Sequence, residues 1–265
     1  MEQRSWHGFV MLALAWTVVL FLVLPLFVVV PVSFTDQRFL SFPQDELSLQ
    51  HYWNLIADPF WRDSILRSLF VSLVSALFAT VLGTLCAIGC WRLANRFGEW
   101  IRLLMLTPII VPSVVHALAF YRAWIELGLI DTYAGVILTH TIIGLPYVVI
   151  TVSAALANVD VRLEQAARSL GADMSQTVRW VLVPLVMPGI LAGAIFAFII
   201  SWDEIVVLLF ITSRNIYLLP KAIWDGINEN VDPTVAAVAT LLIAVTFLML
   251  FAQMTWQGLR GGNRS

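Results

Sequence analysis

The sequence predicts an all-α membrane protein with six transmembrane helices, and three observations support this fold class. Of its 265 residues, 60% are hydrophobic and only 12% are charged, whereas ordinary soluble domains carry roughly 25% charged residues. The mean hydropathy is +0.88. Six stretches of at least 19 residues lack Asp, Glu, Lys and Arg: 9–32, 68–91, 103–121, 132–159, 180–202 and 233–259. This composition excludes a disordered chain, a basic nucleic-acid-binding module and an ordinary soluble enzyme.

Each stretch is long enough for a helix that crosses the bilayer, which needs roughly 20 residues. A membrane β-barrel would instead show alternating segments of about ten residues. The stretch 9–32 exceeds the apolar core of a signal peptide, and no small-residue cleavage site follows it, so it is expected to be a retained helix. We expect one transmembrane domain over residues 1–265, with spans at about 9–32, 68–91, 102–123, 133–157, 184–212 and 233–258.

The distribution of Lys and Arg predicts the orientation, because cytoplasmic loops are enriched in these residues. With the N-terminus inside, the inner side holds nine basic and five acidic residues, and the outer side holds six basic and twelve acidic ones. The inner set includes Arg4, Arg260 and Arg264 at the two ends of the chain. We therefore expect both termini to be cytoplasmic.

The inner segment 158–183 is longer than a connection between neighbouring helices needs. Residues at helical spacing give it one small apolar face, formed by Leu163, Ala167 and Leu170. The pattern predicts a helix along the cytoplasmic surface, followed by re-entry into the membrane at Pro184. A helix with such a face can dock in a groove on a partner, whereas a lipid-bound helix would need larger apolar residues.

Local signals agree with this helix. Glu164 and Arg168 stand at i and i+4, a spacing that supports a helix, and Gly171 suits a C-terminal cap or a tight turn.

The same segment resembles the cytoplasmic EAA motif of binding-protein-dependent ABC importer permeases. The family pattern is Glu-Ala-Ala, three residues, Gly, nine residues and Ile-x-Leu-Pro, and it falls here on Gln165, Ala166, Ala167, Gly171, Val181, Val183 and Pro184. Gln165 stands where the family has Glu, and valines occupy both aliphatic positions. Glu164 is an alternative acid one residue earlier, although it lies about 100° away around the helix.

The resemblance extends over roughly 51–258. The runs His51-Tyr52-Trp53 and Ser201-Trp202-Asp203-Glu204-Ile205 resemble the polyamine-type permease subfamily, in particular the second permease subunit of the spermidine/putrescine permease C type. Members also carry other solutes with amino groups, such as γ-aminobutyrate-like compounds and opines. The resemblance implies a type I ABC importer permease fold in the bacterial cytoplasmic membrane and a polyamine or related small solute.

The resemblance also implies a set of partners. They are a second permease subunit that is different but similar, two ATPase subunits and an external solute-binding protein. The chain has no Gly-rich loop ending in Gly-Lys-Ser/Thr, so ATP and Mg²⁺ are expected on the ATPases, with no cofactor or metal on this chain. The residues expected to couple it to the ATPases are Glu164, Gln165, Ala166, Ala167, Arg168 and Gly171.

Asp203 and Glu204 interrupt an apolar region, which predicts a functional role. Acids within membrane spans are costly and often line a solute path. Beside them, Trp202 offers a ring face to an ammonium group. If the fifth helix continues to residue 212, both acids lie in its outer half; if it ends near Ser201, they lie in an outer vestibule. We expect one of them to line the path, and favour Asp203.

Other polar and aromatic residues have simpler interpretations. Cys86 and Cys90 are expected to pack, because two thiols make an incomplete metal site. The histidines His116 and His140 are expected to make structural hydrogen bonds. An interfacial belt is favoured for the aromatic residues of the outer loop 33–64, which are Tyr52, Trp53, Phe60 and Trp61.

Three other functions fit the sequence less well. An intramembrane serine protease would need Gly-x-Ser, and this tripeptide does not occur. A structural anchor leaves Asp203 and Glu204 unexplained. An ion-gradient-driven secondary transporter or a channel remains the alternative, but such proteins do not need the long segment 158–183.

Overall fold

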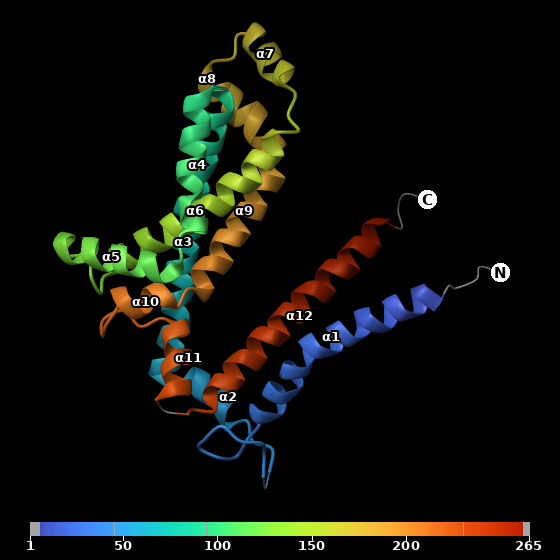
Figure 1. The fold of residues 1–265 in the computed structure, drawn as a ribbon, viewed down its shortest axis with the longest axis vertical. Helices are drawn as coiled ribbons and strands as arrows, with labels where there is room; N and C mark the ends of the chain where they lie inside the picture. The colour runs from blue at the N-terminus through green and yellow to red at the C-terminus, as the bar shows by residue number, and fades with distance from the viewer. Residues whose placement is uncertain (1–5, 45, 94, 230, 262–265) are drawn as a thin grey trace. The chain divides into compact units, whose positions relative to one another are not determined.

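The computed structural model describes residues 6–44, 46–93, 95–229 and 231–261. These residues form helices joined by turns and loops, with no strand among them (Figure 1). They divide into two compact units, of which unit 1 comprises residues 1–62 and 223–265 and unit 2 comprises residues 63–222. The all-α fold class is confirmed.

The elements follow in the order α1 (Trp6–Val32), α2 (Gln50–Ala57), α3 (Pro59–Leu93), α4 (Arg96–Ile110), α5 (Ser113–Leu127), α6 (Tyr133–Leu156), α7 (Val161–Ser169), α8 (Met174–Gln176), the π-helix η1 (Thr177–Leu182), α9 (Val183–Asp203), α10 (Val206–Ile211), α11 (Leu219–Asn228) and α12 (Thr234–Gly261).

Within the described ranges, five helices are long and apolar enough to cross a membrane. They are Gly8–Val32, Pro59–Leu93, Tyr133–Leu156, Met174–Asp203 and Thr234–Thr255. The bent pair α4 and α5 brings the number to six if it forms one span. The expectation that both termini are cytoplasmic concerns ends of the chain that lie outside the described residues.

The predicted single helix at 102–123 is wrong, because the chain breaks between α4 and α5. Val111 is extended, with ψ 132°, and Pro112 follows it with ψ 141°. Proline disfavours the helical conformation in the residue before it and has no N–H to donate. The two helices therefore meet at a bend of 104°.

The predicted helix at 184–212 is wrong at its far end. Helix α9 begins at Val183, next to the predicted start, and ends at Asp203; it continues without interruption the helical stretch that begins at Met174 and includes η1. Glu204 is extended, with ψ 109°, and its carboxylate accepts a hydrogen bond from the Val207 N–H at 2.9 Å. The chain therefore leaves the helical conformation at Glu204, and this side-chain bond satisfies a backbone N–H in the first turn of α10.

The core of unit 2 depends on close packing between α6 and α9, which lie side by side. Gly189 and Gly193 stand one turn apart on α9. A Cβ atom on Gly193 would lie 2.5 Å from Thr151 Oγ1 and 2.9 Å from Val148 Cα. Gly189 would meet Ala155 Cβ at 2.7 Å. Small residues spaced in this way let two helices approach closely in a membrane, where packing drives helix association.

Asp131, between α5 and α6, holds the loop that follows α10. Its carboxylate accepts four backbone N–H bonds at 2.9–3.1 Å, from Ser213, Arg214, Asn215 and Ile216. Burial acts to raise the pKa of Asp131, but these four donors together lower it below its usual value. The carboxylate is therefore ionised at neutral pH and fixes this loop against the α5–α6 turn.

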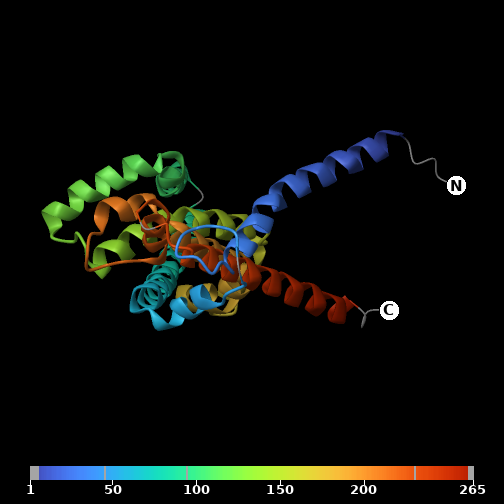
Figure 2. The same cartoon turned by 90° about the horizontal axis from the view of Figure 1, so that it is seen from below.

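Unit 1 contains α1, α2 and α12, with the first residues of α3 and the last of α11. Figure 2 shows that α1 and α12 come together where α1 ends and α12 begins, and separate toward the chain ends. Trp61 is buried, and its Nε1–H donates to Asp232 Oδ2 at 3.2 Å. The prediction of an interfacial belt is therefore wrong for Trp61, whereas Trp53 is exposed.

We predict that Gly193→Ala destabilises the chain, because its methyl group would overlap the Val148 backbone. Overpacking of this kind typically costs about 1–3 kcal/mol. Gly89→Ala is the matched control, because a Cβ there meets nothing within 4 Å. Thermal unfolding of the purified variants should show a lower midpoint for Gly193→Ala alone. Equal midpoints would contradict the assigned packing.

Candidate functional site

The segment between α6 and α9 folds into a short helix with a cap at each end. The Asp160 carboxylate accepts the Arg162 N–H at 2.8 Å at the start of α7. At the other end, Gly171 has φ +91°, the Gly171 N–H donates to the Arg168 carbonyl and the Ala172 N–H donates to the Ala167 carbonyl. This pair of bonds is the Schellman motif, which a glycine at this position favours. The predicted helix and its cap at Gly171 are confirmed.

The small apolar face of α7 is not covered by the rest of the chain. Leu163 is 45% exposed and Leu170 is 89% exposed, with Ala167 half-buried between them. Figure 1 shows α7 at the end of unit 2 where α8 and α9 begin. An uncovered apolar face on a short, well-capped helix is a feature of docking surfaces.

One flank of α7, beside the apolar face, is tied to α3. Arg92, near the end of α3, forms an ion pair with Glu164 and also contacts Met174 Sδ. The two charged side chains are 16% and 12% exposed. Glu164 and Arg168 stand on the same helix as the spacing predicts, but Glu164 pairs with Arg92. Gln165 is exposed on α7, so the two candidate residues for the acidic position point in different directions.

A capped turn then joins α7 to the long helix. The Asp173 carboxylate accepts the Gln176 N–H, and the Gln176 side chain accepts the Asp173 N–H, which together form a capping box. The π-helix η1 follows directly and leads into α9. Because the helix runs without interruption from Met174 to Asp203, it spans about 45 Å at 1.5 Å per residue.

Asp203 and Glu204 differ in their surroundings at the far end of this helix. Glu204 is half-buried and bonded to the start of α10. Asp203 is exposed, and no hydrogen bond or ion pair reaches its carboxylate from the described residues. Trp202 is half-buried and stacks on Phe198 with ring centroids 5.9 Å apart. Of the two acids, Asp203 is the one available to an external group.

A buried hydrogen bond fixes this end of α9. His140 on α6 is 1% exposed, and its Nδ1 shares a hydrogen bond with Ser201 Oγ at 2.8 Å. Ser201 lies two residues before Asp203, so the bond fixes the backbone that carries the acid. The sequence suggested a structural hydrogen bond for His140 but gave no means of finding its partner, which is 61 residues away.

The remaining polar candidates have local contacts. His116 packs on Phe120 with centroids 6.2 Å apart. Cys86 and Cys90 are free thiols whose sulfur atoms lie 4.0 Å apart. Within the described ranges, no group of three or more His, Cys, Asp or Glu side chains is arranged to hold a metal ion. The structure therefore leaves two candidate sets, α7 with its neighbours and the acidic end of α9, at opposite ends of one helix.

Comparison with solved structures identifies the fold. The chain of the MetNI methionine ABC transporter, in an inward-facing form, is similar with a TM-score of 0.60 and 18% identity, over 78% of this chain and 95% of that chain. An amino acid ABC transporter chain is similar with a TM-score of 0.55 and 17% identity, over 80% and 100% of the two chains. The fold is that of a type I ABC importer permease.

Comparison of sequences identifies the relatives. The spermidine/putrescine transport system permease protein PotC of Escherichia coli is 29% identical over 232 residues, 88% of each chain. The putrescine permease PotI of the same organism is 26% identical over 94% of this chain and 89% of PotI. The trehalose permease SugB of Mycobacterium tuberculosis is 27% identical over 82% of this chain and 81% of SugB.

A family match covers most of the helical region. Residues 79–258, which are 180 of the 265, match the family described as binding-protein-dependent transport system inner membrane component. The matched region includes α7, η1, α9 and the acidic residues after it. The chain therefore belongs to this family and is a membrane permease subunit of an ABC importer.

Proposed function

We propose that this permease subunit forms half of a membrane path for a polyamine, such as spermidine or putrescine, or a related solute with amino groups. A second, similar permease would supply the other half, two ATPase subunits would drive transport and an external binding protein would deliver the solute. Family membership favours this ATP-driven importer over a secondary transporter or a channel. The relatives named above are transport permeases, which are not themselves enzymes.

The uncovered face of α7 is the observation that carries the proposal. In a monomer, exposure of Leu163 and Leu170 costs free energy, because apolar surface is more stable out of water. A groove on an ATPase subunit would bury this face. The caps at Asp160 and Gly171 keep α7 short and stiff, and the Arg92–Glu164 ion pair links it to α3. A movement of the ATPase would then move α3 and α9 together with α7.

The choice of a cationic solute rests on Asp203. A negative charge in the last turn of a helix is unfavourable by about 0.3–1 kcal/mol, because it faces the negative end of the helix dipole. Asp203 ends α9 and has no cation beside it among the described residues. An ammonium group of the solute would neutralise the carboxylate, and the ring of Trp202 can add a cation–π contact.

Removal of the charge at Asp203 should therefore reduce uptake of the cationic solute. We predict that Asp203→Asn lowers uptake of labelled putrescine or spermidine about tenfold at low solute concentration, since hydrogen bonds to charged groups contribute about 1.5–3 kcal/mol. The measurement uses the complete importer in vesicles, with labelled γ-aminobutyrate and trehalose as comparison solutes.

Glu204→Gln is the matched control for this experiment, because it keeps an oxygen that can accept the Val207 N–H. It should transport nearly as well as the unmodified chain. Normal polyamine uptake by Asp203→Asn would refute the assignment of Asp203 to the path. Uptake of trehalose but of no amino solute would refute the proposed solute class.

The Arg92–Glu164 pair predicts a charge-reversal rescue. Arg92→Glu places two acids together where both side chains are largely buried, and removal of one partner from such a pair typically costs about 3–5 kcal/mol. We expect ATP hydrolysis to continue with little solute uptake in this variant. The double variant Arg92→Glu/Glu164→Arg should recover most of the uptake per ATP hydrolysed.

The exposed pair Arg122–Glu126 offers a control for charge reversal, with side chains that are 79% and 61% exposed. Arg122→Glu should leave the uptake per ATP unchanged, since exposed pairs contribute little. A double variant that remains as uncoupled as Arg92→Glu would contradict the role of the ion pair.

A further inference from the structure

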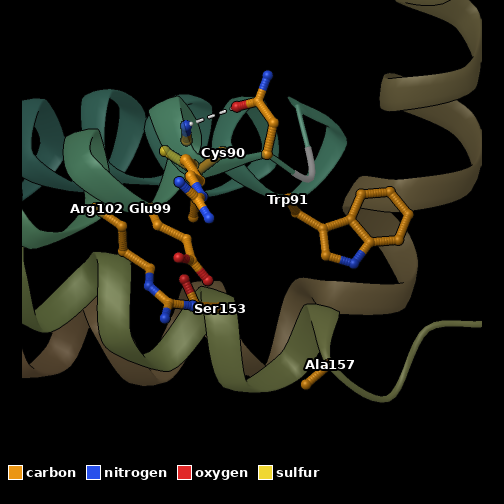
Figure 3. Close-up of a pocket in the computed structure, with 10 residues that line it drawn as sticks. Cys90, Trp91, Glu99, Arg102, Ser153 and Ala157 are labelled. Carbon is orange, nitrogen blue, oxygen red and sulfur yellow. Dashed lines mark hydrogen bonds between the residues drawn. The ribbon is translucent and has the colours of Figure 1, made fainter.

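A cavity of about 530 Å³ with a mixed polar and apolar lining lies in unit 2 where α3 ends, α4 begins and α6 ends. Figure 3 shows side chains from these helices extending into it. Its polar and aromatic lining comes from Trp91, Asn95, Arg96, Glu99, Arg102 and Ser153. None of these residues belongs to the two candidate sets of the transport site.

The residues that line the cavity include more basic than acidic side chains. It contains Arg96 and Arg102 against one acid, Glu99. Within the part of the chain that the structure describes, neither arginine forms an ion pair, whereas the nearby Arg92 is paired with Glu164. A guanidinium group binds phosphate through two parallel hydrogen bonds, which makes arginine the usual residue for phosphate recognition.

A second, apolar cavity of about 210 Å³ lies next to the first, between α4 and α6. The two share Arg102 and Ser153, and the second is otherwise lined by Leu106, Val149 and Ile150. Ile150 is 45% exposed. Two arginines in one cavity beside an apolar groove on a membrane helix pair match the chemistry of a lipid, which has a charged headgroup at one end and an acyl chain at the other.

We propose that these two cavities bind one anionic phospholipid. Arg96 and Arg102 hold its phosphate, and an acyl chain lies along Leu106 and Ile150. A free phosphate ion would use the arginines but leave the apolar groove empty. The inference rests on the proposed function in one respect, since docking of α7 on the ATPases places this end of unit 2 at the cytoplasmic leaflet. Basic pockets between helices on this side recognise anionic headgroups.

Photolabelling of the complete importer tests the proposal. The importer is placed in nanodiscs that contain phosphatidylglycerol and phosphatidylcholine with identical acyl chains. In one sample the phosphatidylglycerol carries a photoreactive group on an acyl chain, and in a second sample the phosphatidylcholine carries it. Labelled peptides are identified by mass spectrometry, with no transport required, so the result does not depend on the proposed solute. We expect phosphatidylglycerol to label peptides around Leu106 and Ile150 about fivefold more than phosphatidylcholine. Phosphatidylglycerol carries one net negative charge, and its attraction to one basic side chain is worth about 1 kcal/mol.

Matched variants give the assignment its specificity. The double variant Arg96→Gln/Arg102→Gln should lose the preference for phosphatidylglycerol, and Arg96→Lys/Arg102→Lys should keep part of it. Arg179→Gln is the control, because Arg179 is exposed at the same end of unit 2 and lines neither cavity. Assembly with the other subunits checks the folding of each variant.

Three results would overturn the proposal. Equal labelling by the two lipids would show that the arginines do not select an anionic headgroup. Loss of labelling in excess inorganic phosphate would assign the cavity to a soluble anion. Absence of labelling in the complete importer would show that a protein subunit covers the groove.

Discussion

The close approach of α9 to α6 is the constraint on which the rest of unit 2 depends. Gly189 and Gly193 leave no room for a side chain between the two helices, and the His140–Ser201 bond adds a polar contact near the far end. In a membrane, the hydrophobic effect does not drive helices together as it does in a soluble core, so close packing and hydrogen bonds between helices must stabilise the fold. The continuous helix from Met174 to Asp203 is thereby held along its length.

This arrangement gives the proposed mechanism a physical route. Helix α7 precedes one end of the helix that runs from Met174 to Asp203, and Asp203 lies at the other end. On this account, the ATPases push on α7, the Arg92–Glu164 pair carries the movement to α3, and α9 carries it to the acidic end. Coupling through a rigid element requires that the element have few internal degrees of freedom, which the caps of α7 and the packing of α9 provide.

Much of the architecture follows from composition and spacing. Uncharged stretches identified the apolar helices, and the Leu163, Ala167 and Gly171 pattern identified α7 and its cap. The breaks at Val111–Pro112 and at Glu204 were missed because hydropathy averages over about 20 residues and does not register a local change in ψ. The proline after Val111 was a signal for the first break, whereas no residue type at Glu204 marked the second.

The partners of individual side chains could not be predicted, because they join distant parts of the sequence. Glu164 pairs with Arg92, 72 residues away, and Asp131 binds a loop more than 80 residues away. A helical spacing rule favoured Arg168 for Glu164, but such a pair contributes only about 0.2–0.5 kcal/mol. A partly buried partner from α3 competes successfully with so weak a preference.

The most direct test of the account is the contact that α7 makes in the assembled importer. A photoreactive amino acid placed at Leu170, which is 89% exposed, should cross-link to an ATPase subunit. The same group at Trp180, which is 70% exposed on η1, provides the comparison. Cross-linking of Leu170 to lipid alone, with the ATPases bound and active, would contradict the claim that α7 is the point at which they drive the permease.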